Sequence, residues 1–185
     1  MVENPFAVTV QEAYDMIAAA KKAGVNLMYA QTWRFLPYGA KTRHLIEAGE
    51  IGDPISITAS YISERVRRGL LWHRQLALGG GFFMYEGTHF FDQVKWLMGS
   101  EIETVYAVGM GTYLLESDGE DNGLAGYRFE NGTFGTLHNG SSNPGARIAG
   151  WTIVGTGGII AVENETVRLG KGDWREVPTD DVNGF

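Results

Sequence analysis

His89 is the side chain best suited to chemistry, because an imidazole titrates near neutral pH and can take up or release a proton. Tyr85 lies four residues before it and Asp92 three residues after it, so a single helix would carry all three on one face. Asp92 could orient the imidazole or bond to a neighbouring sheet. Tyr85 could donate a hydrogen bond to a substrate oxygen or be an ordinary buried aromatic residue, and His89 itself could be bonded only to structure.

Glu86 raises a metal-dependent alternative for the same segment. The Glu-x-x-His spacing of Glu86 and His89 places a carboxylate and an imidazole on adjacent helical turns, as in some helix-borne metal sites. Asp92 or His73 could add a third ligand and leave a position for an activated water, which would suit a hydrolase. This spacing is common by chance, so the alternatives of a divalent metal and no metal both stay open.

Two further groups of residues are candidates for ligand binding. Trp72, His73 and Arg74 combine an indole that can stack on a sugar ring with a guanidinium that can pair with an anion. Trp33 and Arg34 come where a predicted strand ends and a helix begins, a usual place for binding residues. Arg34 could instead pair structurally with a carboxylate.

The elements that must position these residues are helices first and strands afterwards. Thr9 and Glu12 form a capping-box pattern that predicts a helix ending at Gly24, and 26–31 is typical of a short buried strand. Further helices are expected from Pro37 to Gly49 and over 82–98. Between them, 55–63 alternates as a strand does, whereas 64–81, with Arg65, Arg67 and Arg68, has no clean period and predicts a long, solvated, partly ordered loop.

The second half of the chain predicts a mostly antiparallel sheet. Asn131-Gly132 separates two alternating segments as in a hairpin, and shorter strands follow over 150–156, 158–163, 166–169 and 174–178. The pattern indicates an α+β fold with two or three helices on one face of an open sheet. Apolar residues of both parities in these strands suggest that the other face forms a homodimer, the alternative being a half-solvated sheet. His138, beside Leu137, could point into a pocket or to solvent.

Composition narrows the class of protein. The 185 residues are expected to form a single domain, 1–185, without cysteines for disulfides or thiol chemistry. Fifteen basic and 22 acidic residues give a net charge of −7, which argues against a nucleic-acid or anionic-membrane surface. No long apolar run or signal-peptide pattern is present, so a soluble cytoplasmic protein is the expectation.

The order of several motifs resembles the C-terminal domain of the Gfo/Idh/MocA oxidoreductases, which are NAD(P)-dependent enzymes acting mostly on sugars and cyclitols. The resemblance covers nearly the whole chain and rests on five segments: Glu3-Asn4-Pro5, Trp33 to Pro37 with Leu45 to Gly52, Gly79 to Gly99, Phe129 to Leu137, and Ile153 to Gly158. It implies that His89 is the acid/base residue and that the 72–74 segment edges the pocket.

The departures from the family pattern are informative. No nucleotide-binding domain is recognisable: Gly155-Thr156-Gly157-Gly158 lacks the third glycine of a dinucleotide fingerprint and is typical of a hairpin turn. Asn4 stands at the family's lysine position, whose cation would contact the nicotinamide or the substrate oxygen, and Tyr85 stands at its acidic position. The resemblance therefore implies a sugar- or polyol-binding and dimerising domain whose NAD(P) would be held by a missing domain, with no redox turnover expected of this chain alone.

Two other functions remain open. One is a stand-alone hydrolase, lyase or epimerase that reuses the pocket without a nicotinamide, with or without a metal. The other is a non-catalytic binding or scaffold dimer. The sequence does not name the substrate.

Overall fold

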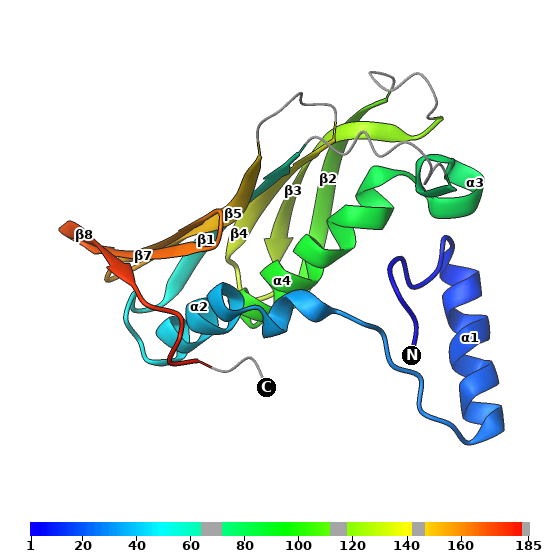
Figure 1. Ribbon diagram of the computed structural model, residues 1–185, viewed down its shortest axis with the longest axis horizontal. Coiled ribbons are helices and arrows are strands. Elements are labelled where there is room, and N and C mark those ends of the chain that lie inside the picture. Colours follow the sequence, from blue (N-terminus) through cyan, green and yellow to red (C-terminus); the bar gives the residue numbers. More distant parts are fainter. Residues whose placement is uncertain (64–71, 112–117, 142–146, 183–185) are drawn as a thin grey trace.

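The computed structural model describes residues 1–63, 72–111, 118–141 and 147–182, and its centre is one large sheet (Figure 1). The helices are α1 (Val10–Ala23), α2 (Pro37–Glu47), α3 (Leu76–Gly79) and α4 (Thr88–Met98), with short 3-10 turns η1 (Thr32–Phe35) and η2 (Trp72–Arg74) and a π-helical stretch η3 (Phe83–Gly87). The strands are β1 (Pro54–Ile62), β2 (Ile102–Gly111), β3 (Glu120–Phe129), β4 (Phe134–Gly140), β5 (Ile148–Gly155), β6 (Ile159–Glu163), β7 (Thr166–Lys171) and β8 (Asp173–Val177).

The sheet joins two antiparallel meanders through one inserted strand. Its order is β2-β3-β4-β1-β5-β6-β7-β8, and β1 runs parallel to β4 but antiparallel to β5. The predicted hairpin at Asn131-Gly132 and the later strands are confirmed. The segment Gly155 to Gly158 is a turn between β5 and β6, closed by a bond from Gly155 N to Gly158 O of 2.8 Å, as expected. The α+β fold is thus confirmed.

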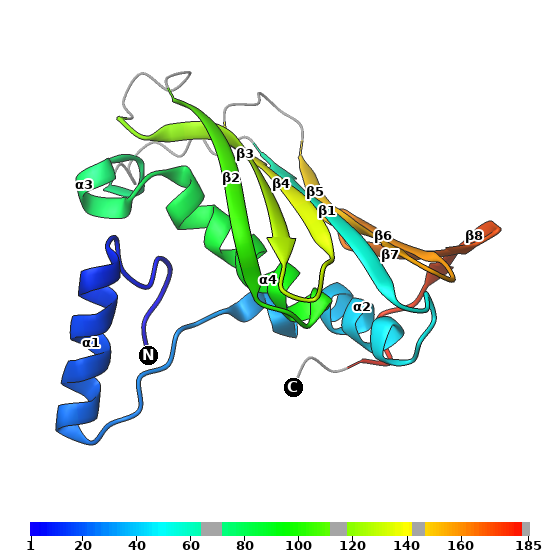
Figure 2. The same ribbon diagram turned by 180° about the vertical axis from the view of Figure 1, so that it is seen from behind.

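Helices α2 and α4 cover one face of this sheet, whereas α1 stands apart from it in both views (Figure 2). Phe90, Val94 and Leu97 of α4 are almost wholly buried against inward-facing residues such as Phe129 and Leu137. Burying such side chains contributes roughly 1.5–3 kcal/mol each, so this layer holds α4 on the sheet. Among the described residues, no helix is long and apolar enough to cross a membrane.

The opposite face of the sheet carries apolar side chains in solvent. Leu124, Phe134 and Ile148 are each more than 40% exposed, while the residues that follow them, Ala125, Gly135 and Ala149, are buried. The sheet therefore carries apolar residues on each of its two faces, as the sequence indicated.

The strand predicted over 26–31 is wrong. This segment forms only an isolated parallel bridge between Val2 and Tyr29, and Ala30 is its one buried residue. A strand needs neighbours for its backbone N–H and C=O groups, and the described chain supplies only Val2 there. No residue of α1 is buried either, so its apolar face, with Ile17 49% exposed, packs little against the described chain.

The loop predicted over 64–81 is also partly wrong. Residues 72–79 form η2 and α3, because the Asp118 carboxylate accepts from Leu76 N at 2.7 Å and Gly80, at φ 75°, ends the helix. Residues 64–71, with the three predicted solvated arginines, lie outside the described residues. The helix predicted over 82–98 exists, but its first part is π-helical.

The capping box at Thr9 gives a local test of α1. Thr9 Oγ1 accepts from Glu12 N at 3.2 Å, and the Glu12 carboxylate accepts from Thr9 N at 2.9 Å. We expect Thr9→Ala to lower amide protection in α1 about five-fold, since an N-cap contributes about 1 kcal/mol. The melting temperature of the sheet domain should not change. Hydrogen exchange read by mass spectrometry measures both, and a parallel loss of protection in α4 would contradict this independence.

The same cap has a defined pH dependence. The bonds from the Thr9 and Val8 backbone lower the pKa of the Glu12 carboxyl. A carboxyl whose pKa is lowered in the folded state stabilises it above the unfolded pKa, and that contribution is lost as the pH falls through the lowered value. The amide protection factors of α1, which are corrected for intrinsic exchange rates, should therefore fall as the pH is lowered, before the sheet unfolds.

Candidate functional site

His89 lies in the first turn of α4, and the stretch before it is fixed against the sheet. Phe83 N donates to Glu120 Oε1 at 2.9 Å. The ring of Phe83 lies over Gly123 so closely that a Cβ there would sit 2.2 Å from Cε2. Glycine on β3 therefore lets the π-helical stretch approach the sheet, and this approach sets where α4 and His89 begin.

Two residues from the segment before α2 hold the imidazole. His89 Nδ1 lies 3.2 Å from Gln31 Oε1, and the ring stacks on the Trp33 indole at 5.0 Å with 5° between the planes. When Nδ1–H donates to the Gln31 oxygen, Nε2 carries the lone pair, which is the form that a general base needs. Gln31 was missed from the sequence, although it is the polar residue that ends the apolar 26–31 segment just before Trp33.

Arg34 and Asp92 form a bidentate ion pair with each other. Arg34 Nε donates to Asp92 Oδ2 at 2.6 Å, and Nη2 donates to Oδ1 at 2.5 Å. The hydrogen bonds that it donates to the Asp92 carboxylate raise the pKa of the Arg34 guanidinium. The idea that Asp92 orients the imidazole is therefore wrong, because both of its oxygens face Arg34, and the structural interpretation of Arg34 holds.

This pair should contribute measurably to folding. In a double-mutant cycle with Arg34→Ala and Asp92→Ala, we expect a coupling of about 1 kcal/mol, the upper end for a partly exposed pair, because the geometry is bidentate. Urea unfolding of the four proteins gives the coupling. A value near zero would mean that the two side chains are held by their own helices and not by each other.

Asn4, at the family's lysine position, is engaged in structure. Its Nδ2 donates to the Tyr85 carbonyl, and its Oδ1 accepts from Thr88 Oγ1 and Tyr29 Oη, each at 2.5 Å. Burial raises the pKa of the Tyr29 hydroxyl, which therefore stays protonated and donating. Asn4 thus ties the N-terminal segment to the residue just before His89 but brings no positive charge to the site.

Trp72, His73 and Tyr85 form a second cluster. The rings of His73 and Tyr85 lie 4.7 Å apart, and Trp72 stands edge-on to both, at 5.8 Å and 5.6 Å. Tyr85 therefore packs on the 72–74 segment. The side chain of Arg74 lies outside the described residues.

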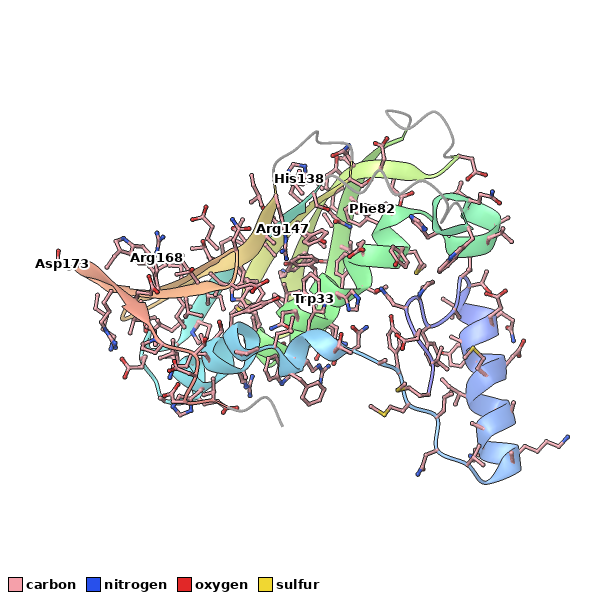
Figure 3. All side chains as sticks on the ribbon, in the orientation of Figure 1. Trp33, Phe82, His138, Arg147, Arg168 and Asp173 are labelled. Carbon is pink, nitrogen blue, oxygen red and sulfur yellow. The ribbon has the colours of Figure 1, made fainter. Side chains whose placement is uncertain are left out.

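The remaining candidates lie elsewhere. Glu86 is buried, and Asp92 is committed to Arg34, so the proposed ligands Glu86, His89 and Asp92 do not gather around a common point. Within the described residues, no group of three histidine or acidic side chains could hold a metal ion. His138 lies on the outer face of β4, opposite buried Leu137, near the upper end of the sheet in Figure 3. His138 therefore lies on the face of the sheet away from α4 and His89.

A cavity of about 660 Å³ opens beside the partners of His89. Tyr29, Gln31, Arg34 and Asp92 supply its polar part, and Met28 and Phe35 are among its apolar walls. Its size lies within the roughly 300–1,000 Å³ of small-molecule sites. The geometry thus defines a helix-borne imidazole on an α+β scaffold, with a stacked indole and an amide partner that itself lines the cavity.

This fold and this site place the chain in a family. Residues 40–161 match the model of the GFO/IDH/MocA C-terminal domain, and the chain therefore belongs to the GFO/IDH/MocA family.

Particular relatives agree with this assignment. The chain is 29% identical over 180 residues to the uncharacterized oxidoreductase YrbE of Bacillus subtilis, covering 93% of this chain and 51% of that protein. It is 27% identical over 165 residues to scyllo-inositol 2-dehydrogenase (NAD(+)) of B. subtilis, covering 87% and 47%. A levoglucosan dehydrogenase solved with NADH and levoglucosan superposes with a TM-score of 0.85 at 27% identity, over 96% of this chain and 53% of that one. The chain spans about half the length of these relatives.

Proposed function

We propose that this chain is the substrate-binding half of an NAD(P)-dependent oxidoreductase that acts on a sugar or cyclitol. The observation that carries the proposal is His89, held between Gln31, which lines the 660 Å³ cavity, and Trp33, in a chain of this family. The relatives named for scyllo-inositol and levoglucosan oxidation support a polyol substrate class.

The residues of this chain would handle the proton and the position of the substrate. His89 Nε2 would accept the proton of the reacting hydroxyl while Gln31 holds Nδ1, and Trp33 would keep the imidazole plane fixed. A nicotinamide held outside this chain would take the hydride. Trp72, His73 and Tyr85 would form another wall, on which an apolar sugar face can rest.

The described residues do not fit a whole dinucleotide. No glycine-rich turn leads from a strand into a helix, and Arg34, the cation of the 660 Å³ cavity, is paired with Asp92. We therefore assign the nucleotide to another domain. The exposed apolar face of α1 and the 26–31 segment, whose one β-bridge within the described chain is to Val2, are suited to pack against that domain.

The outer face of the sheet is proposed to join two copies. Exposed Leu124, Phe134 and Ile148 give an apolar surface that can pair with its own copy. Sedimentation should show a dimer, and Phe134→Asp should shift it to monomer without loss of fold. Wild-type protein that sediments as a monomer at micromolar concentration would contradict this assignment.

A second candidate follows from two substitutions on the site. Asn4 and Tyr85 replace a lysine and an acidic residue of the family pattern, and both are engaged in local packing. A hydrolase, lyase or epimerase without net redox chemistry would need His89 but not that lysine.

The deciding experiment uses the full product of the coding sequence that contains this chain. It is incubated with cyclitols, pyranoses and anhydrosugars, with and without NAD⁺ or NADP⁺, while reduced nicotinamide and product are followed. Turnover that requires the dinucleotide supports the proposal. Turnover without any dinucleotide supports the second candidate, and binding without turnover in either case would favour a scaffold protein.

A further inference from the structure

A second cavity, of about 370 Å³, is lined in part by Trp33, and its polar walls, Arg147, Glu165 and Thr179, play no part in the function proposed above. Its walls come from five separate parts of the chain and include Trp33, Tyr38, Tyr61, Arg147, Glu165 and Thr179. Figure 3 labels Trp33 and Arg147 in the central part of the molecule, where the helices meet the sheet. Leu36 lines both this cavity and the 660 Å³ cavity, and Trp33, which lines this one, also stacks on His89.

The cavity combines aromatic faces with one pair of opposite charges. The Arg147 guanidinium lies 5.9 Å from the centre of the Tyr61 ring. Its Nη1 is 3.8 Å from Glu165 Oε1, which is an ion-pair distance but beyond a hydrogen bond. Both groups therefore keep hydrogen-bonding capacity for a ligand, one as donor and the other as acceptor.

Glu165 occupies a backbone position that its residue type disfavours. It follows Asn164 in the tight turn between β6 and β7, and the two have φ values of 81° and 45°. Such turns favour Asn-Gly, because a side chain in the left-handed region costs energy. A glutamate in the glycine position of this turn, aimed at a cavity, indicates a role for its carboxylate.

The Tyr38 hydroxyl adds a donor to the same cavity. Burial raises its pKa to about 12, Glu165 acts in the same direction, and Arg147 opposes them. The hydroxyl is therefore protonated throughout the physiological range, and it lies within the field of both charged groups.

We propose that this cavity binds a second, uncharged pyranose ring, so that the substrate is a disaccharide or glycoside whose first ring reacts at His89. Aromatic rings take the C–H face of a pyranose, and adjacent donor and acceptor groups match its vicinal hydroxyls. The balanced pair of Arg147 and Glu165 favours a neutral ring, because a carboxylated or phosphorylated ring would meet the Glu165 carboxylate. The inference rests on the proposed function, since it extends the same site past Trp33.

The test compares dissociation constants of the purified chain for neutral disaccharides and for the methyl glycosides of their single rings, by calorimetry. We expect the best disaccharide to bind about ten-fold more tightly than its single ring. Glu165→Gln and Arg147→Gln should bring this ratio close to one. The matched exposed variants Glu163→Gln and Arg168→Gln should leave it unchanged.

A further variant separates binding from folding. Glu165→Gly should raise the melting temperature, because glycine relieves the left-handed turn, while it also abolishes the ten-fold preference. If single rings bind and disaccharides gain nothing, this inference fails and the proposed function stands. If a uronic-acid disaccharide binds more tightly than its neutral counterpart, the assignment of a neutral ring is overturned. If no sugar binds at all, the proposed function fails with it.

Discussion

His89→Ala is expected to lower kcat for polyol oxidation by the full protein about 100- to 10,000-fold, the usual contribution of a positioned general base. Without the imidazole, water must accept the hydroxyl proton as the hydride departs. The loss should fall mainly on kcat, because Trp33 and the cavity walls remain in place for binding.

The matched control is His44→Ala. His44 is exposed on α2 and outside the described sites, so its removal should leave kcat within about two-fold, as for ordinary surface substitutions. Gln31→Leu should lower kcat less than His89→Ala does, since His89 Nδ1 would lose its acceptor while the imidazole remains. A fall of less than ten-fold in His89→Ala would place the acid/base residue elsewhere.

Phe90→Ala should have the largest effect on stability. The ring is fully buried and stands edge-on to Trp33 at 4.7 Å, with Tyr61 at 5.4 Å. Deleting a buried phenylalanine costs about 3–5 kcal/mol, the sum of lost transfer energy and the cavity left behind. Urea unfolding measures this as a fall in the free energy of unfolding.

The control for this prediction is Tyr14→Ala, which removes an aromatic ring that is 64% exposed on α1. It should change stability by less than about 0.5 kcal/mol. Phe90→Leu, which keeps most of the volume, should cost clearly less than Phe90→Ala. Equal losses of unfolding free energy in Phe90→Ala and Tyr14→Ala would contradict the packing described around Trp33. Because Phe90 supports Trp33, Phe90→Ala should also loosen the stacking of Trp33 on His89.

The sheet could be predicted from the sequence because alternation, glycine turns and hairpin signals act locally. The structure of 26–31 could not be predicted in this way, since an apolar run shows that a segment avoids water but not which strand pairs with it. The described chain offers only Val2 as a neighbour there.

The site was predicted in part for similar reasons. His89 and Trp33 were candidates from their residue types and positions, and they do lie together. Asp92 was given the wrong partner, because helical spacing says which residues share a face but not which segment that face meets. Tyr85 packs on the 72–74 segment, a contact between separate parts of the chain that helical spacing does not reveal, and Gln31 carries no motif that marks it.

The most direct test of the central claim is a titration of the purified chain with cyclitols and pyranoses, followed by nuclear magnetic resonance. If this chain holds the substrate site, the Trp33 indole N–H and the His89 ring protons should shift with a common dissociation constant. The same signals should not move in response to NAD⁺ alone. Sugar-induced shifts confined to the outer face of the sheet around His138 and Phe134, or no shifts with any polyol, would contradict the assignment of a substrate site at His89.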